Sequence, residues 1–573
     1  MTMRLPQIAL LLVVGLGACE PTTQSEPPVT MEFPATNRPD VRGTQGAVSS
    51  GHPLATAVGR DVLRRGGNAT DAVVAMAGVL AVVRPNMNGV GGDAFGIFYD
   101  GESGEITGLN GSGRSGTKAT PAYFAQAGHT TVPETGALSV SVPGAVSAWA
   151  EALDRHGTLG LDELLQPAIR YAEEGFPVSW RLAADFEAQG SALNEWGQAL
   201  YLPNGAPPPI GSLLRNEALG ATLRTIAREG ASPLYDGAIA RRLAAFVDSL
   251  GGTLAPEDFQ RHTSTWVPTL SDAYLGHQLH VLPPNTQGMA QLAYTGMAKH
   301  HDLMEMGHNT SSYLHTLIEL KKLAFADRDA WATDPDFASI PLDELLDPAY
   351  LESRAGDFSA TSAQSGVLAG ISNGITDSDD GEQPDDSGDT VYLTAVDQWG
   401  NAVSWIQSLF HGFGSGLLEP ETGIVLHNRG SLYTLEAGHP NVVAPGKRPY
   451  HTLTPLLATR PDGAFAFTLG TPGGDSQTQS LLQIMNNMTL FGMSPQAAIE
   501  APRFRGYEGL RVDLEDRVPA DVVEALRSMG HDIQIINGWT ATFGGAQMIM
   551  YDPTHGTLVA AADPRREAYA LAY

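Results

Sequence analysis

Cysteine is almost absent from this 573-residue sequence, and basic side chains are scarce. A single cysteine, Cys19, excludes an internal disulfide framework and any Cys-x-x-Cys metal site. Lysine and arginine number 34 against 63 aspartates and glutamates, so the formal net charge is −29. A field of this sign repels phosphate backbones, and we therefore expect no nucleic-acid partner. The hydrophobic content of 42% is that of a globular protein with a large core.

The apolar run near the N-terminus, IALLLVVGLGA at residues 8–18, is too short to span a bilayer as a helix. It is typical of a signal peptide, which we place at residues 1–18. Cys19 follows directly in LGAC, which resembles the lipobox of bacterial lipoproteins, so we expect Cys19 to be lipidated. The alternative is an ordinary signal peptide followed by a chance cysteine.

Residues 19–45 are rich in proline and threonine, as expected for an extended tether. Together with lipidation, this predicts a bacterial lipoprotein that is anchored to a membrane and faces the periplasm or the cell exterior.

Apolar spacing predicts helices and hairpins that alternate along the chain. A mostly buried helix pair is predicted within residues 51–83, broken at Gly66 and Gly67, with Asn68 or Thr70 as a cap. Longer helical stretches are predicted within residues 141–176 and 311–331, and hairpins with polar turns at residues 95–109, 391–406, 456–470 and 546–562. Hairpins need partners that bury their apolar faces, so the fold class is α/β, with helices layered outside paired sheets.

The longest stretch without predicted structure, from about residue 357 to Asp389, ends at Thr390, where an alternating strand begins. A threonine in a strand is ordinarily only a good β former. If the chain is cut before Thr390, however, that residue gains an α-amino group with a pKa of about 7.7–8.0. The amine can then act as the base for its own hydroxyl, and a flexible loop before a rigid strand suits such a cut.

A glycine pair, Gly473 and Gly474 in LGTPGGDSQ, follows a predicted strand. Glycines allow backbone N–H groups to approach a substrate closely, so the pair is a candidate for stabilising an oxyanion. A plain turn is the alternative.

Eight sequence blocks occur in order: GGNATDAVVAMAGVLAVVRPNMNGVGGDAFGIFYD, SVPGAVSAW, FADRDAW, DTVYLTAVDQWGNAVSW, PGKRPYHTLTP, GTPGGDSQTQ, APRF and DPRR. This set resembles the gamma-glutamyltransferase family, also called glutathione hydrolases, from about Gly46 to the C-terminus. The resemblance implies an N-terminal nucleophile hydrolase with an αββα sandwich and no cofactor. It also implies a proenzyme that cuts itself into a large subunit, residues 46–389, and a small subunit, residues 390–573, which stay together as a heterodimer.

The resemblance implies specific roles at the reaction centre. Thr390 is both the processing residue, cut from Asp389, and the nucleophile. Gly473 and Gly474 form the oxyanion hole, and Ser408 is the hydroxyl residue that assists the nucleophile.

Donor-binding residues follow from the same resemblance. Arg114, in LNGSGRSG, corresponds to the arginine that binds the donor α-carboxylate, which suits the fork of a guanidinium. This segment can also be aligned with the family two residues away, which would place the family arginine at a neighbouring position. His451 and Thr452, in PYHTLTP, stand where the family usually has a pair of serines.

The chain departs from the family pattern at two places. Family members that use glutathione carry acidic residues after NNQ to hold the donor α-amino group, whereas this chain reads LHNRGSLY, with Ser431 and Leu432 there. An asparagine expected shortly after Ser408 is replaced by Phe410.

These features predict a gamma-glutamyltransferase or glutathione hydrolase that acts on small-molecule amides and favours hydrolysis over transpeptidation. One alternative is a related amidohydrolase or acylase that acts on oxamate, glutaryl or cephalosporin-type amides. A second is a catalytically inactive lipoprotein that serves as a surface binding module.

Two other patterns carry weaker signals. GVGGDA at residues 89–94 matches a dinucleotide-binding glycine pattern, but a strand rather than a helix follows it. His300, His301, His308 and His315 are clustered without an HExxH motif, so we expect histidines on a helix surface and no metal site.

Overall fold

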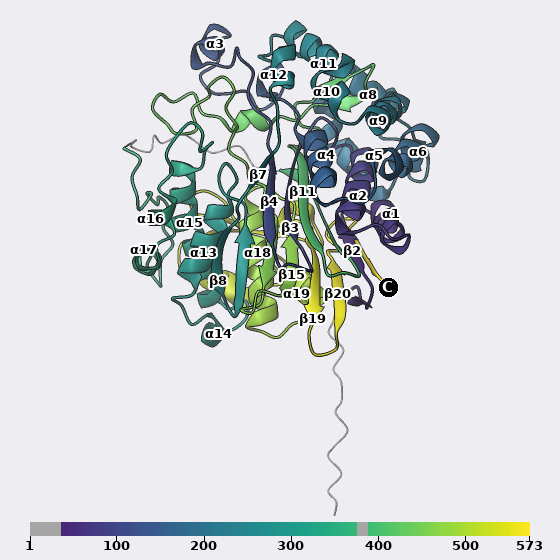
Figure 1. Cartoon of the computed structure of the whole chain (residues 1–573). Coiled ribbons are helices and arrows are strands. Elements are labelled where there is room, and N and C mark those ends of the chain that lie inside the picture. The colour runs from purple at the N-terminus through teal and green to yellow at the C-terminus, as the bar shows by residue number, and fades with distance from the viewer. Residues whose placement is uncertain (1–35, 375–387) are drawn as a thin grey trace, which may run out of the picture. The chain divides into compact units, whose positions relative to one another are not determined.

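Two seven-stranded antiparallel sheets lie face to face at the centre of the protein (Figure 1). The computed structural model describes residues 36–374 and 388–573. The first sheet has the order β21 (Tyr569–Ala572), β2 (Ala47–Ser50), β10 (Asp389–Val396), β11 (Ala402–Phe410), β3 (Asp93–Tyr99), β4 (Ile106–Gly111) and β7 (Thr265–Val267). The second has the order β1 (Val41–Gly43), β20 (Thr557–Ala562), β19 (Gln547–Asp552), β15 (Phe465–Gly470), β14 (Leu456–Thr459), β9 (His277–Val281) and β8 (Leu270–Tyr274).

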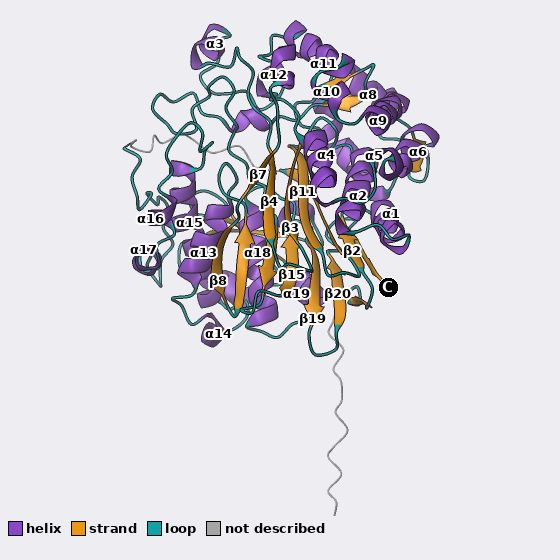
Figure 2. Cartoon of the chain, in the orientation of Figure 1, coloured by secondary structure: helices purple, strands orange, loops and turns teal. Residues whose placement is uncertain are grey.

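Helices cover the outer face of each sheet, as Figure 2 shows. On the first sheet lie α1 (Pro53–Arg64), α2 (Ala69–Val83) and α4 (Ala145–His156), and the same hydrophobic core includes α6 (Gln166–Glu174), α7 (Trp180–Gln189), α9 (Glu217–Glu229) and α11 (Ala238–Ser249). On the second lie α13 (Gly288–Ala298), α18 (Ser476–Thr489) and α19 (Pro495–Glu500), and its core includes α15 (Ser311–Trp331) and α20 (Ala520–Ser528).

Strand β10 shows why the layers form. Val391 and Leu393 belong to the core beneath the first helical layer, whereas Tyr392 belongs to the core between the two sheets. Successive side chains of a strand point to opposite faces, so an apolar strand buries one set on helices and the other on a second sheet. The fold is therefore an αββα sandwich of the N-terminal nucleophile hydrolase type, as the sequence predicts.

The predicted local elements are present. Asn68 caps α2, because its side chain accepts a hydrogen bond from the Asp71 backbone N–H (3.0 Å) while the Asp71 carboxylate accepts one from the Asn68 N–H (2.9 Å). The four predicted hairpins are β3–β4, β10–β11, β14–β15 and β19–β20.

The N-terminal boundary of the folded part differs from the prediction. Residues Val41–Gly43 form β1 and pair with β20, and the backbone N–H groups of Asn37 and Arg38 bond to the Glu500 carboxylate. The folded part therefore begins before Gly46. The predicted signal peptide and Cys19 lie outside the described residues, among which no helix is long and apolar enough to cross a membrane.

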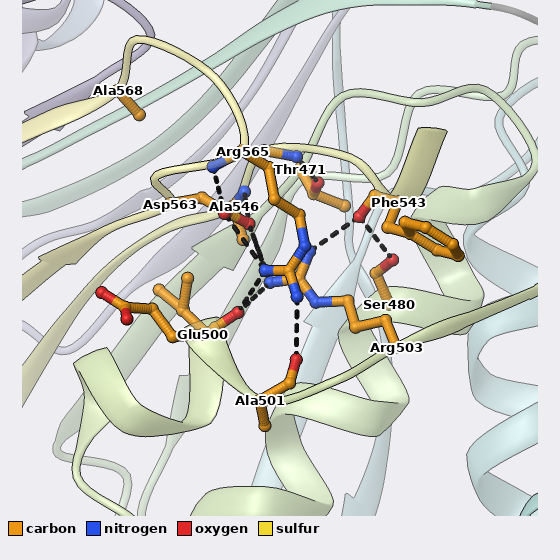
Figure 3. A network of polar contacts seen from close by, with 12 residues as sticks. Thr471, Ser480, Glu500, Ala501, Arg503, Phe543, Ala546, Asp563, Arg565 and Ala568 are labelled. Carbon is orange, nitrogen blue, oxygen red and sulfur yellow. Dashed lines mark hydrogen bonds and ion pairs between the residues drawn. The ribbon is translucent and has the colours of Figure 1, made fainter. Parts of the chain in front are cut away.

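Two of the sequence blocks, APRF and DPRR, meet in one buried ion network (Figure 3). Arg503 bonds to the Asp563 carboxylate at 2.8 Å, and Arg565 bonds to Asp563 at 3.2 Å and to Glu515 at 2.5 Å. Arg565 also donates to the carbonyls that end α19, at Ile499 and Ala501 (both 2.8 Å). Arg503, Asp563 and Arg565 therefore hold the end of β20 against α19.

Replacing Asp563 with asparagine is expected to destabilise the protein by about 3–5 kcal/mol, because it removes a partner of two fully buried guanidinium groups. Chemical denaturation at neutral pH measures this change. Glu524→Gln, which breaks an exposed pair with Arg527, is the control, with an expected loss below about 1 kcal/mol. Equal effects of the two substitutions would contradict the assignment.

Candidate active site

Thr390 is buried at the start of β10, beside Ser408 on the neighbouring strand β11. The strand register shifts between Asp389 and Thr390, so the pairing is irregular at this peptide bond. The Thr390 hydroxyl donates a hydrogen bond to the Ser408 hydroxyl at 2.9 Å. The structure thus brings together the two residues predicted as nucleophile and assistant.

Asp389, the residue before Thr390, is held through both its backbone carbonyl and its side chain. The Ser408 hydroxyl donates to the Asp389 carbonyl oxygen at 2.9 Å. The same hydroxyl therefore contacts Thr390, the predicted nucleophile, and the carbonyl that Thr390 is predicted to attack. The Asp389 carboxylate is bound by Arg566 (2.9 Å) and Gln189 (2.6 Å). The Thr390 hydroxyl and the Asp389 carbonyl thus share one hydrogen-bond partner, Ser408.

Arg429 is a site residue that the sequence analysis missed. It is fully buried, and its guanidinium donates to the hydroxyls of Ser408 (3.1 Å) and Thr452 (3.3 Å). The Phe410 ring lies 4.3 Å from its central carbon. LHNRGSLY contained the signal, because Arg429 directly precedes the segment in which the acidic residues are missing.

Gly473 and Gly474 lie between β15 and α18, with φ angles of +122° and +55° that favour glycine. Gly470, at the end of β15, lies so close to Tyr392 on β10 that an added Cβ would be 2.2 Å from its ring. Pro472 and Thr390 line one small cavity. The glycine turn therefore begins next to the nucleophile, and its role as an oxyanion hole stays a prediction.

His451 and Thr452 lie beside this centre, and Asp93 joins them from β3, directly opposite Ser408 in the strand register. Nε2 of His451 lies 2.9 Å from the Ser112 hydroxyl and 3.3 Å from the Asp93 carboxylate. Burial, and then the charge of Arg429, lowers the pKa of His451 to about 3, so its imidazole is neutral at neutral pH.

Asp93 is a second residue that the sequence analysis did not single out. Burial acts to raise its pKa, but the facing imidazoles of His427 and His451 outweigh that effect and hold the pKa well below its usual range. The backbone N–H groups of Gly113 (2.9 Å) and Gly144 (3.1 Å) also donate to this carboxylate. Asp93 is therefore a fixed negative charge behind His451.

Arg114 faces carboxylates of the protein itself. Its guanidinium lies 3.6 Å from Asp334 and 3.7 Å from Asp336. Ser112, two residues earlier, contacts His451. Binding of a donor carboxylate by Arg114 stays a prediction.

Two glycines of GVGGDA, Gly91 and Gly92, lie where the backbone packs closely against neighbouring backbone carbonyls. A Cβ added at Gly92 would lie 2.4 Å from the Ser408 carbonyl oxygen, and one added at Gly91 would lie 2.1 Å from the Val425 carbonyl oxygen. They let the start of β3 lie against the strand that carries Ser408.

His315, the last of the four clustered histidines, is buried rather than on a helix surface, which corrects the prediction. Its ring contacts His531 (2.8 Å) and the Ser359 carbonyl (2.8 Å). The adjacent Glu319 carboxylate binds the Lys322 ammonium at 2.7 Å. These contacts fasten the segment after α17 (Pro348–Arg354) to α15.

Comparisons with known proteins agree with this architecture. A sequence profile of the family described as Gamma-glutamyltranspeptidase matches residues 55–573. The glutathione hydrolase-like YwrD proenzyme of Bacillus subtilis is 36% identical over 93% of this chain and 99% of its own length. The oxamate amidohydrolase proenzyme of Klebsiella pneumoniae is also 36% identical, over 92% and 99%.

Among solved structures, a cephalosporin acylase from Bacillus halodurans superposes with a TM-score of 0.86 at 35% identity, covering 96% of this chain and 98% of that one. Sequence and fold thus agree over nearly the whole length. The chain belongs to the gamma-glutamyltranspeptidase family of N-terminal nucleophile hydrolases.

Proposed function

We propose that the protein is an amide hydrolase that cuts itself between Asp389 and Thr390 and then uses Thr390 as its N-terminal nucleophile. The observation that carries the proposal is the position of the Ser408 hydroxyl, 2.9 Å from both the Thr390 hydroxyl and the Asp389 carbonyl oxygen. The products of the cut are a large subunit that ends at Asp389 and a small subunit, residues 390–573, which remain together because β10 is a central strand of the first sheet.

Self-cleavage follows from that contact. As the Thr390 oxygen bonds to the Asp389 carbonyl carbon, its proton passes to Ser408, whose own proton goes to the carbonyl oxygen. The C–N bond then breaks, the nitrogen takes a proton, and Asp389 is left as an ester on Thr390. That step frees the α-amine of Thr390, and water then hydrolyses the ester, giving a new carboxylate on Asp389 and restoring the hydroxyl of Thr390.

Turnover repeats this chemistry on an external amide. The free amine of Thr390 accepts the hydroxyl proton, the hydroxyl attacks the donor carbonyl, and the amine product leaves with a proton. Backbone N–H groups of Gly473 and Gly474 stabilise the oxyanion. Water then releases the acid from the acyl-enzyme.

The donor is proposed to be an acyl group with a carboxylate near the scissile amide, such as γ-glutamyl, glutaryl or oxalyl, with Arg114 as the ligand for that carboxylate. Ser431 and Leu432 supply no charge for a γ-glutamyl ammonium, so hydrolysis of γ-glutamyl amides, including glutathione, is proposed to be modest and transfer to amino acids weaker still. The relatives named as an oxamate amidohydrolase and a cephalosporin acylase support an amidohydrolase as the second candidate. Retention of Thr390 and Ser408 in contact argues against an inactive binding protein.

We also propose that Cys19 carries lipid and holds the enzyme on a membrane that faces the periplasm or the cell exterior. The support is the LGAC sequence after a short apolar run.

Thr390→Ala is expected to remain one chain of full length without amidase activity, because it lacks the attacking oxygen. A denaturing gel and an amide-hydrolysis assay measure both effects. Thr390→Ser, which keeps the hydroxyl, is the control and is expected to be cut. An alanine variant that still matures and hydrolyses amides would contradict the nucleophile assignment.

Leu432→Asp is expected to raise the turnover of γ-glutamyl anilide relative to glutaryl anilide by about tenfold, since a partner for the ammonium contributes on the order of 1.4 kcal/mol at a partly exposed position. Leu432→Asn matches the size of aspartate without its charge and is expected to leave the ratio near that of the wild type. A wild-type enzyme that already prefers γ-glutamyl and transfers it readily to dipeptides would refute the reasoning.

Cys19→Ala is expected to move the protein from the membrane fraction to the soluble fraction, because no other cysteine is available for acylation. Fractionation, with incorporation of a labelled fatty acid as a second measurement, checks this. An unchanged distribution with no label in the wild type would contradict lipidation.

A further inference from the structure

Asp389 is held at its carbonyl oxygen and at both carboxylate oxygens by residues from three parts of the fold. The carbonyl oxygen accepts a hydrogen bond from Ser408 on β11. One carboxylate oxygen accepts from Arg566, which follows β20, at 2.9 Å, and the other accepts from Gln189, at the end of α7, at 2.6 Å. The side chains of Asp389 and Arg566 are only 7% and 8% exposed. The carboxylate is therefore fixed in one orientation.

Strand pairing alone does not orient Asp389. The register of β10 on β11 shifts between Asp389 and Thr390, so the regular pairing starts only at Thr390. The hydrogen bond from Ser408 sets a distance to the carbonyl oxygen, but it does not set the direction from which Thr390 meets the carbonyl carbon. An attack needs both the distance and the direction. The two contacts to the carboxylate supply the second constraint.

Arg566 is itself held by the buried ion network of Figure 3. It directly follows Arg565, which bonds to the Asp563 carboxylate at 3.2 Å. The stem of Arg566 packs on the backbone of Gly545, where an added Cβ would lie 2.7 Å from Cδ of Arg566. Arg566 and Thr390 line the same small cavity. The network thus holds a cation at a defined place beside the cleavage site.

Gln189 is held by its surroundings as well. Its side-chain oxygen accepts a hydrogen bond from Asn86 at 3.1 Å, and a Cβ added at Gly412 would lie 2.4 Å from that oxygen. The bond to Asn86 directs the NH₂ group of Gln189 toward Asp389, because an amide has its acceptor and its donors on opposite sides.

Another cation that lines the cavity is paired with different carboxylates. Arg84 bonds to Asp185 at 2.9 Å and to Glu567 at 3.2 Å. Within the part of the chain that the structure describes, Arg566 is the cation at ion-pair distance from Asp389. A charge-assisted hydrogen bond of this kind is stronger than one between neutral groups.

We propose that Arg566, together with Gln189, positions Asp389 for self-cleavage, so that the protein selects its cleavage site by the acidic side chain before Thr390. The contacts keep the acyl group of Asp389 in place while it passes from the nitrogen to the oxygen of Thr390 and the hydroxyl proton ends on that nitrogen. The inference rests on the proposed self-cleavage and adds the residues that orient the bond. Arg566 is a positioning residue, because it acts through the Asp389 carboxylate.

The rate of self-cleavage tests the inference. The full chain is labelled during cell-free synthesis, synthesis is stopped, and the small subunit is followed over time on a denaturing gel. Arg566→Gln and Asp389→Asn are each expected to be cut about 10- to 100-fold more slowly, the range for a lost hydrogen bond to a charged group and a misplaced reacting atom. Arg566→Lys keeps the charge and is expected to recover part of the rate. Wild-type rates in both Arg566→Gln and Asp389→Asn overturn the inference.

A double variant separates positioning through Asp389 from a general effect on the fold. Arg566→Gln combined with Asp389→Asn is expected to be cut no more slowly than the slower single variant, because both changes remove the same contact. A double variant slowed by the product of the two single effects overturns the inference, since the two residues would then act independently.

Glu567→Gln is the matched control, because it removes a carboxylate from the neighbouring Arg84. Its cleavage rate is expected to stay within about twofold of the wild type, since Arg84 keeps its bond to Asp185. A loss in Glu567→Gln equal to that in Arg566→Gln overturns the inference, because any change of charge near the cavity would then have the same effect.

Failure of this inference is distinguishable from failure of the proposed function. A wild-type chain that is cut at Thr390, with Arg566→Gln and Asp389→Asn cut equally fast, contradicts the inference alone. A wild-type chain that is never cut contradicts both. Thermal unfolding of the same variants in the Thr390→Ala background shows whether each has folded, and Asp389→Asn carries the test where Arg566→Gln has not.

Discussion

One hydroxyl group, that of Ser408, is the contact on which the rest of the site depends. It accepts a hydrogen bond from Thr390 and donates one to the carbonyl of Asp389, so nucleophile and target are fixed by a single oxygen atom. Antiparallel pairing of β10 with β11 sets that geometry. Burial of both strands between helices and a second sheet keeps it rigid, and the network around Arg565 fastens the end of β20 that packs nearby.

Polar and charged side chains lie on both sides of this contact. Asp389 is held by Arg566 and Gln189 before the cut, while Arg429 lies on the other side of Ser408. The Phe410 ring lies against the Arg429 guanidinium, 4.3 Å from its central carbon.

Local patterns in the sequence predicted much of the fold. The hairpins, the cap at Asn68 and the 21-residue helix α15 follow from periodicity and turn chemistry within short windows. The start of the folded part was missed because β1 pairs with a strand more than 500 residues away. Arg429, Asp93 and the buried His315 were missed for the same reason: their partners come from sheet register and helix packing. The direction of Arg114 likewise depends on Asp334 and Asp336, which lie far from it in sequence.

The intact masses of the purified protein's polypeptides, with N-terminal sequencing of the smaller one, test the central claim most directly. The account predicts two pieces, the smaller beginning Thr390-Val391-Tyr392 with a free α-amine. A single uncut chain in an active preparation, or a cut at any other bond, would contradict it.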